Sequence, residues 1–210
     1  MKDFVTFRGD INAIHRLTKD IKLSEQVAKK ATVSAINKSI TSTRAFAVKL
    51  VAKDYKISQK VVRDELKLVK ANYSSMEAKI IGSGSPGIPL YKFAPTPKKV
   101  PSTRRLKSGG YTPKGGIKVM IRKGARKTVQ GAFIAQMSSG HIGVFKRKKS
   151  GPGQAGKQGI DELFGPSPLR ILDDDRYYQQ LDDFTEETMD KNYAREVDFY
   201  LKKAGVFKNA

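Results

Sequence analysis

Apolar residues recur every three or four positions along an early stretch of the chain, which is the spacing of one face of an α-helix. The residues that follow this spacing are Val33, Ile36, Ile40, Thr43, Ala47 and Leu50. Ser24 and Glu25 offer an N-cap and an acidic first turn, and no Gly or Pro follows before Ser58. The pattern predicts a helix of roughly 30 residues, about 45 Å long.

A second, shorter helix is predicted to begin at Ser58, whose hydroxyl can accept hydrogen bonds from free backbone amides. Ile57 and Val62 stand at the two positions of a hydrophobic staple. We expect this helix to end near Lys67.

Beyond residue 76 the pattern changes to that of β structure. The candidate strands are 78–81, 117–122, 132–137 and 141–147, with 88–93 as extended chain interrupted by Pro89. The last two strands are predicted to form a hairpin, because Gly140 between them supplies the positive φ that a short turn requires.

Two segments are predicted to be flexible basic loops. Residues 94–116 are rich in Pro, Gly, Lys and Arg, and residues 148–159 are mostly Lys, Gly and Gln. Both contain hardly any large apolar side chain that could anchor them in a core.

The last part of the chain again has helical spacing. Steps of three and four relate Tyr178, Leu181, Thr185, Met189, Tyr193, Val197, Tyr200 and Ala204. This stripe predicts a long helix within a C-terminal helical segment 168–205 that Gly205 stops.

Together these elements predict an α+β fold in a single domain over residues 1–210. A long N-terminal helix packs on a small antiparallel β-sheet of roughly four or five strands with hairpins, and a long C-terminal helix completes the fold.

Composition narrows the class of protein. Hydrophobic residues make up 39% of the chain, too many for a disordered protein, and no apolar run approaches the roughly 20 residues that span a bilayer. Charge follows Met1 too soon for a secretory signal. The chain has no Cys, which excludes disulfides and thiolate metal sites and suits a reducing cytoplasm. We expect the protein to fold where it is made and to have no membrane partner.

The net charge of +21 favours an anionic partner. Residues 78–160 contain 18 Lys and Arg and no Asp or Glu, whereas residues 161–210 contain 12 acids and seven bases. Such asymmetry suits contacts between subunits, with the acidic end of one meeting the basic middle of the next, as well as it suits nucleic acid. Both interpretations stay open on charge alone.

One segment imitates a nucleotide-binding motif. Residues 151–158, Gly-Pro-Gly-Gln-Ala-Gly-Lys-Gln, match the phosphate-binding loop through its lysine. The next position should be Ser or Thr to bind magnesium, and it is Gln158; no apolar strand precedes the segment, and Gly159 follows it where a helix should begin. Nucleotide hydrolysis is therefore not predicted.

No other catalytic or metal-binding constellation stands out. His15 and His141 lack the spacing to carboxylates that a metal or acid–base site needs, and His141 beside a turn is expected at the surface. The run 173–175 consists of three Asp, which we interpret as the solvated first turn of a helix rather than a cation site. We predict no catalytic residue, metal or cofactor.

Basic side chains form the candidate contact surface for a partner or DNA. They are Lys98, Lys99, Arg104, Arg105, Lys107, Arg122, Lys123, Arg126, Lys127, Lys146, Arg147, Lys148 and Lys149. The alternative is a merely solvated basic surface, and the only aromatic residues near the first loop are Tyr91, Phe93 and Tyr111, few for a single-strand binder.

Residues 131–147 resemble the hairpin of the phage minor tail protein Z family, in which an Ala-Phe-Ile strand is followed by Gly-His-x-Gly-Val-Phe-x-Arg. Residues 160–167, Ile-Asp-Glu-Leu-Phe-Gly-Pro-Ser, are similar to the family's Ile-x-Glu-Leu-x-Gly-Pro-Ser segment. The Ala-Ile-Asn tract at 35–37 fits the family's N-terminal helix. The resemblance covers most of residues 24–204, and no function is carried onto the two basic loops.

The resemblance implies a structural, non-enzymatic protein of the virion that completes the tail at its head-proximal end and enables head-tail joining. It implies a ring, expected to be hexameric, assembled in the host cytoplasm, with tail tube or tail terminator and head-tail connector proteins as neighbours. Double-stranded phage DNA is a further candidate partner. We expect the hairpin 132–147 and the loop 94–116 to supply the contacts, because both project from the sheet and carry the charge.

Two other classes of function stay open. A basic nucleic-acid-binding module of a ribonucleoprotein or DNA-packaging assembly would bind free DNA with a steep dependence on salt. A diverged hydrolase would turn over a nucleotide.

Overall fold

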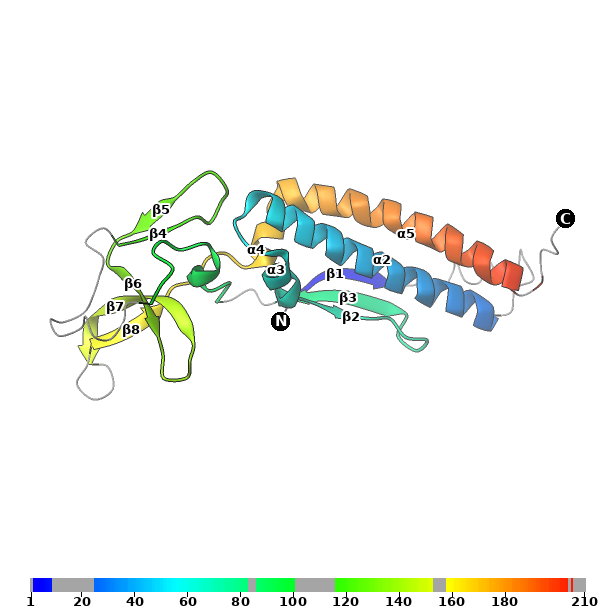
Figure 1. Ribbon diagram of the computed structural model, residues 1–210. Coiled ribbons are helices and arrows are strands. Elements are labelled where there is room, and N and C mark those ends of the chain that lie inside the picture. The colour runs from blue at the N-terminus through cyan, green and yellow to red at the C-terminus, as the bar shows by residue number, and fades with distance from the viewer. Residues whose placement is uncertain are drawn as a thin grey trace. The chain divides into compact units, whose positions relative to one another are not determined.

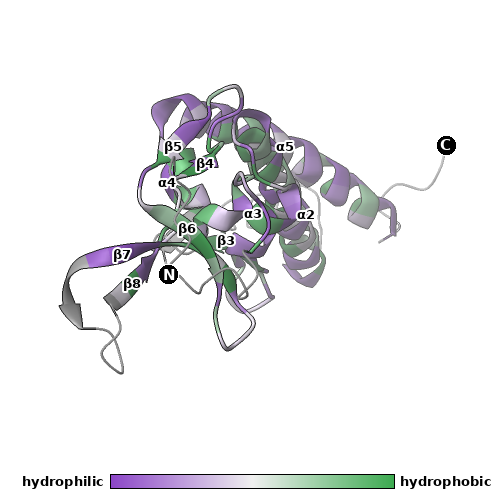
Figure 2. Cartoon of the chain, turned by 60° about the vertical axis from the view of Figure 1, so that its left-hand side comes forward, coloured by the Kyte–Doolittle hydropathy of each residue, from purple (hydrophilic) through white to green (hydrophobic). Residues whose placement is uncertain are grey.

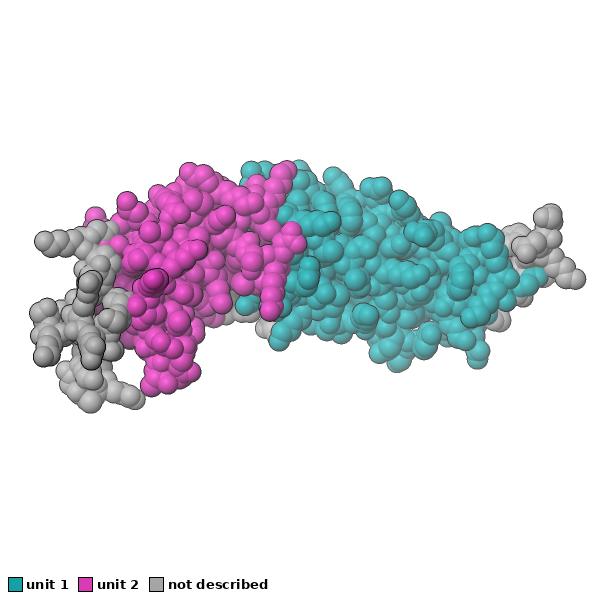
Figure 3. All heavy atoms as spheres, in the orientation of Figure 1, with its two compact units in different colours: residues 1–50, 63–84, 169–210 teal, residues 51–62, 85–168 magenta. Residues whose placement is uncertain are grey.

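The chain divides into two compact units, which Figure 3 colours separately. Unit 1 comprises residues 1–50, 63–84 and 169–210, and unit 2 comprises residues 51–62 and 85–168. The computed structural model describes residues 2–8, 25–82, 86–100, 116–152, 158–203 and 205. Whether the two units fold as one domain stays a prediction.

Two long helices dominate unit 1. Helix α2 (Glu25–Asp54) and helix α5 (Asp175–Lys203) run antiparallel and side by side (Figure 1). The entire predicted apolar face of α2 is buried, so the helix and its orientation are confirmed. Between the helices the rings of Phe46 and Phe184 stack with centroids 4.1 Å apart, an arrangement that stabilises an aromatic pair beyond simple burial.

A three-stranded antiparallel sheet accompanies these helices. Strands β1 (Lys2–Arg8), β2 (Leu66–Val69) and β3 (Glu77–Gly82) lie in the order β1-β3-β2. Leu66, Ala78 and Ile80 are fully buried on it. The predicted strand 78–81 is confirmed as β3, whereas β1 and β2 are strands that the hydrophobic pattern did not reveal.

Polar side chains cap helix α3 (Gln59–Glu65) and attach α2 to a neighbouring part of the chain. Helix α3 begins where predicted, and the Ser58 hydroxyl accepts a hydrogen bond from the Val61 amide at 3.4 Å. On α2, the Asn37 amide group both donates to and accepts from the backbone of Ala71, at 3.0 and 2.8 Å. This paired bond ties α2 to the chain that follows β2.

The buried residues of α5 are Tyr177, Leu181, Glu196 and Leu201; only Leu181 belongs to the predicted stripe, and most of its other members are half-buried. Tyr177 is 2% exposed and Tyr178 is 52% exposed, so the stripe begins at Tyr177. Either residue has helical spacing to Leu181, and packing decides between them: the Arg176 guanidinium lies 4.5 Å from the Tyr177 ring centroid and donates to its hydroxyl at 2.5 Å. The short helix α4 (Pro168–Leu172) precedes this turn.

Unit 2 is built on two small antiparallel sheets. One pairs β4 (Ile117–Val119) with β5 (Lys127–Val129), and the other has the order β6-β7-β8, formed by β6 (Ala132–Gln136), β7 (Ile142–Pro152) and β8 (Gln158–Glu162). The predicted hairpin is confirmed as β6 and β7, with Gly140 at φ 84° in its turn. In Figure 2, β6 is hydrophobic and β7 becomes hydrophilic along its basic run.

Several predictions for unit 2 are wrong in detail. Residues 148–152 belong to β7 and residues 158–159 to β8, so most of the predicted loop 148–159 is a continued ribbon, and its centre lies outside the described residues. The segment 88–93 contains a short 3-10 helix, η1 (Leu90–Lys92), in place of extended chain. The described strands form three sheets rather than one sheet of four or five strands.

The predicted loop 94–116 is described only at its two ends. Residues 101–115 lie outside the described part of the chain. Thr96 forms an antiparallel bridge with Lys118, with both backbone hydrogen bonds present at 2.7 and 3.1 Å. The first part of this segment is therefore attached to β4.

No helix among the described residues is long and apolar enough to cross a membrane.

Candidate interaction surfaces

Two of the three segments that resemble the family, 131–147 and 160–167, are paired with each other in unit 2. The first ends in strand β7 and the second begins in β8, with Phe145 opposite Glu162 in the register. The Leu163 amide donates to the Val144 carbonyl at 2.8 Å. Two patterns separated by a basic run in the sequence therefore form a single structure.

A histidine–glutamate contact joins these strands. His141 Nε2 lies 2.8 Å from Glu162 Oε1, and the His141 ring meets the Phe145 ring edge-on. The side chain of His141 is 46% exposed, so its predicted surface position is confirmed, although the sequence did not reveal its partner. A Cβ on Gly143 would lie 2.7 Å from Glu162 Oε1 and 2.9 Å from Phe145 Cζ. Glycine at this position is what allows the contact.

The second segment also holds the η1 region in place. The Leu90 amide donates to the Leu163 carbonyl, and the Gly165 amide donates to the Ile88 carbonyl, both at 2.8 Å. A Cβ on Gly165 would lie only 2.5 Å from Cε2 of the fully buried Phe93. These residues therefore build the core of unit 2, and their chemistry is packing and hydrogen bonding.

The predicted basic contact residues fall on three parts of unit 2. The described ones with assigned side-chain exposure are all exposed: Lys98, Lys99, Arg122, Lys123, Arg126, Lys127, Lys146, Arg147 and Lys148. Lys149 belongs to β7, and the remaining three, Arg104, Arg105 and Lys107, lie outside the described residues. The structure therefore brings the 98–99 and 122–127 groups together, since Lys98 and Lys123 line one hollow. The third group, 146–149, lies on strand β7 of the sheet β6-β7-β8.

Several of these cations are engaged within unit 2. The Arg147 guanidinium lies 5.4 Å from the Phe133 ring centroid, and Lys148 Nζ lies 3.2 Å from an Asp161 carboxylate oxygen. Arg126 donates to the Thr96 hydroxyl at 2.6 Å. Such contacts orient the side chains without removing their charge.

Four lysines line one hollow of unit 2, which we call the basic groove. Its volume is about 580 Å³, and its polar or aromatic lining includes Tyr55, Lys56, Ser58, Tyr91, Lys92, Lys98 and Lys123. No carboxylate belongs to the lining residues. The sequence singled out Lys98 and Lys123 as contact residues but missed Lys56 and Lys92, because Lys56 lies far away in the chain and Lys92 stands alone.

Backbone hydrogen bonds bring the distant segments of the groove together. The Lys56 amide donates to the Ile121 carbonyl at 2.9 Å, and the Lys123 amide donates to the Asp54 carbonyl at 2.8 Å. The Arg122 guanidinium covers the Tyr55 ring at 5.5 Å. Backbone hydrogen bonds thus hold residues 54–56 and 121–123, which carry part of the groove lining, next to each other.

The charge of the chain is concentrated in unit 2. Its sequence contains 20 Lys and Arg and three acids, a net +17, whereas unit 1 contains 21 Lys and Arg and 17 acids, a net +4. A net charge of this size raises the local potential and accelerates association with anionic surfaces. Unit 2 is therefore much more positively charged than unit 1.

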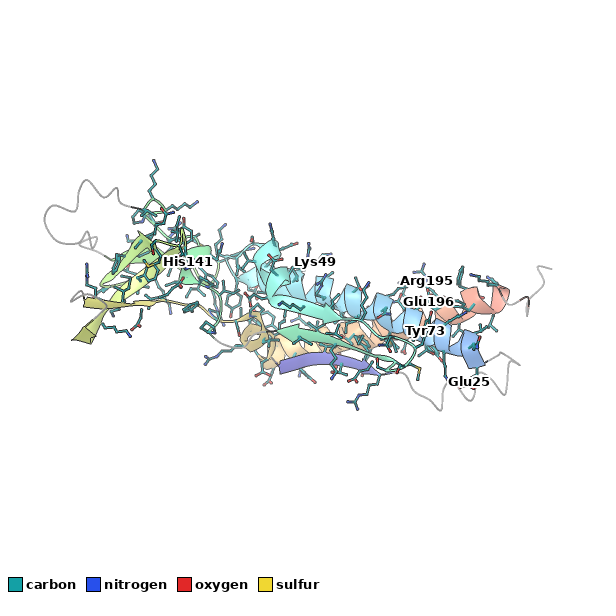
Figure 4. All side chains as sticks on the ribbon, turned by 90° about the horizontal axis from the view of Figure 1, so that it is seen from below. Glu25, Lys49, Tyr73, His141, Arg195 and Glu196 are labelled. Atoms are coloured by element: carbon teal, nitrogen blue, oxygen red, sulfur yellow. The ribbon has the colours of Figure 1, made fainter. Side chains whose placement is uncertain are left out.

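Unit 1 contains a buried carboxylate between its two long helices. The Glu196 side chain is 8% exposed; it accepts a hydrogen bond from the Ser34 hydroxyl at 2.5 Å and forms an ion pair with Lys38. Lys38, the partner of Glu196, lines a polar groove together with Tyr73, and Figure 4 labels both Glu196 and Tyr73. Burial alone would raise the pKa of Glu196, but the hydrogen bonds from Lys38 and Ser34 and the Lys38 charge outweigh it and hold the pKa below its ordinary value.

Replacing Glu196 with Gln is expected to lower the free energy of unfolding by about 1–2 kcal/mol at neutral pH, because charge-assisted hydrogen bonds are lost. A lowered pKa in the folded protein contributes stability that is fully present above the unfolded pKa and disappears as pH falls through the folded pKa. Urea unfolding should therefore show a difference at pH 7 that shrinks at acidic pH. Asp198→Asn, which breaks an exposed pair with Lys202, serves as control and should change stability by less than about 0.5 kcal/mol. An equal effect of Glu196→Gln at both pH values would contradict this role.

Two segments of the sequence imitate an enzyme or metal motif: the nucleotide-like segment 151–158 and the acidic run 173–175. Strand β8 begins at Gln158, directly after the lysine of the nucleotide-like segment, where a phosphate-binding loop requires a helix. In the acidic run 173–175, an Asp174 carboxylate oxygen accepts a hydrogen bond from the Arg176 amide at 3.2 Å. No group of three potential metal ligands is gathered within the described residues.

Comparison with known proteins agrees with the paired segments in unit 2. The model of the prophage minor tail protein Z family matches residues 7–204. No match was found among curated proteins or among solved structures. Because the family model spans nearly the whole chain, including both units, the chain belongs to the prophage minor tail protein Z family.

Proposed function

We propose that this minor tail protein completes the head-proximal end of a bacteriophage tail, where copies form a ring, expected to be hexameric, that enables the head to join. The observation that carries the proposal is the family match over residues 7–204. The role is mechanical rather than catalytic, and its direct neighbours are tail tube or tail terminator and head-tail connector proteins.

The charge distribution supports a role at a joint between assemblies. Unit 2 has a net charge of +17 and suits contact with an anionic partner, whereas the net charge of unit 1 is only +4. A subunit with chemically different surfaces can contact a neighbouring copy and an unlike protein at the same time. The hairpin 132–147 and the segment 94–116 remain our candidates for contact with the neighbouring proteins.

Deleting the gene from an inducible lysogen tests the proposal. We expect electron micrographs of the lysate to show DNA-filled heads and separate tails, because the subunit that completes the tail is missing. Expression of the wild-type protein in the same cells is the control and should restore joined particles. Intact, infectious virions from the deletion strain would show that the protein does not act at head-tail joining.

Direct binding of double-stranded DNA by unit 2 is the second candidate function, favoured by its net +17. Contacts to several phosphates would make the affinity fall about 10³- to 10⁵-fold between 50 and 200 mM salt. If the purified protein bound free DNA tightly at 50 mM salt and released it over this range, a nucleic-acid-binding role would replace the structural one. The tail-completion role predicts only weak capture of free DNA even at 50 mM salt.

A further inference from the structure

The outward side of α5 carries a run of carboxylates that we call the acidic face. Its members are Asp182, Asp183, Glu186, Glu187 and Asp190, and all five are exposed. On another side of the same helix Leu181 is buried and Phe184 stacks on Phe46 of α2. Packing against α2 therefore fixes the helix so that the acidic face is presented to solvent.

Nothing in the described residues neutralises the acidic face. None of its five carboxylates forms an ion pair within the described part of the chain, whereas Asp198 of the same helix pairs with Lys202 at 2.9 Å. Three pairs of these acids are four positions apart, a spacing at which like charges destabilise a helix. The helix dipole favours acids only in the first turn, and α5 begins at Asp175, well before Asp182. Lys191 stands four positions after Glu187, but no ion pair joins these two described residues, so the like-charge pairs dominate this part of the helix.

The basic groove of unit 2 is the electrostatic counterpart of the acidic face. Its four lysines are Lys56, Lys92, Lys98 and Lys123, all exposed, and within the described residues none of them forms an ion pair. Because the backbone frame of the groove is hydrogen bonded, the four lysines are attached at fixed points around one hollow. Binding then orders only their side chains and not the backbone that carries them.

We propose that the acidic face of one copy docks on the basic groove of the next copy. The two surfaces carry five carboxylates and four ammonium groups, so their charges nearly cancel in a contact. Tyr55 and Tyr91 line the groove, and Tyr178, exposed one helical turn before Asp182, supplies an aromatic side chain on the other surface. Aromatic residues are enriched in the core of protein interfaces, and polar residues form the rim around it.

A contact between two different surfaces of the same chain is heterologous, so it repeats from copy to copy and closes into a ring when the rotation allows. The inference rests on the proposed function, since a ring is what this contact builds. It adds to that function the two surfaces through which neighbouring copies recognise one another.

Charge reversal on each surface tests the contact. The face variant carries Asp182→Lys, Asp183→Lys, Glu186→Lys and Glu187→Lys. The groove variant carries Lys56→Glu, Lys92→Glu, Lys98→Glu and Lys123→Glu. Neither variant can pair with itself, whereas a mixture of the two, or a variant with all eight changes, again brings opposite charges together.

Sedimentation velocity at low salt provides the readout. We expect the wild type to self-associate, each variant alone to associate at least about 100-fold more weakly, and the mixture and the eightfold variant to recover. The control variant makes the same charge change at exposed acids elsewhere, with Glu25→Lys, Asp64→Lys, Asp173→Lys and Asp198→Lys, and should behave like the wild type. Circular dichroism verifies that each variant is folded. Association of both variants at wild-type strength, or monomers in the wild type and the mixture alike, would overturn the contact.

The contact and the proposed function can fail separately. If wild-type protein supplied to deletion-strain cells restores joined particles and the face variant does so equally well, the contact is wrong and the function stands. If the wild type itself restores nothing, the function is wrong whatever its self-association. If the groove binds double-stranded DNA in preference to a second copy, mutating it will abolish DNA capture while sedimentation stays unchanged, and the contact is rejected.

Discussion

Replacing Gly165 with Ala is expected to lower the free energy of unfolding of the protein by about 2–3 kcal/mol. The new Cβ would lie 2.5 Å from Phe93 Cε2 and 2.9 Å from Phe93 Cζ. Phe93 is fully buried, so its ring cannot move into solvent to make room. Urea unfolding followed by circular dichroism measures the change. Gly159→Ala is the control, because its neighbour is the flexible end of Lys148, and it should change stability by less than about 0.5 kcal/mol.

A double-mutant cycle shows whether Gly165 and Phe93 act on each other. Phe93→Ala alone should cost about 3–5 kcal/mol, because it removes a large buried ring. In that background the methyl group added by Gly165→Ala enters the space the ring has left, so the double variant should be more stable than the sum of the two single effects by at least about 1 kcal/mol. Additive effects would show that the Gly165 position is constrained by something other than Phe93.

Two adjacent tyrosines of α5 are expected to respond very differently to truncation. Tyr177→Ala should cost about 3–4 kcal/mol, because the ring is buried and its hydroxyl accepts from Arg176. Tyr178→Ala should stay within about 0.5 kcal/mol, because its side chain is exposed. Thermal unfolding of the two variants under the same conditions makes the comparison. Equal losses would mean that the buried stripe of α5 is not the one the structure shows.

The long helices could be predicted from the sequence because their buried faces are long and regular. Six residues with helical spacing marked the inner face of α2, and all six are buried. For α5 the same reasoning found the helix but chose Tyr178 over Tyr177 and missed the buried Glu196 and Leu201. Helical spacing admits both positions, and only contact with the rest of unit 1 distinguishes them. Periodicity therefore predicts an element better than it predicts the first buried residue.

The strands were harder to predict because short or basic strands resemble loops. Strand β2 has only four residues, and the second half of β7 is a run of Lys, Ser, Gly and Pro that carries no apolar alternation. The strand is stabilised by pairing with β8 rather than by its own pattern. Sequence propensity for β structure is weak where neighbouring strands supply the stability.

The candidate surfaces were only partly visible in the sequence for a similar reason. The basic block and the acidic end could be recognised from composition, but the basic groove also needs Lys56, which backbone hydrogen bonding brings beside residue 121. The pairing of His141 with Glu162 likewise depends on the register of β7 and β8. Long-range pairing of this kind carries no local signature.

Joining of separated heads and tails in vitro tests the central claim most directly. DNA-filled heads and tails from the deletion strain are mixed with purified protein, and joined particles are counted by electron microscopy and by infectivity. The tail-completion role predicts that joining requires the added protein and that incubating the protein with tails before heads is sufficient. Joining at the same level without the protein would contradict the account.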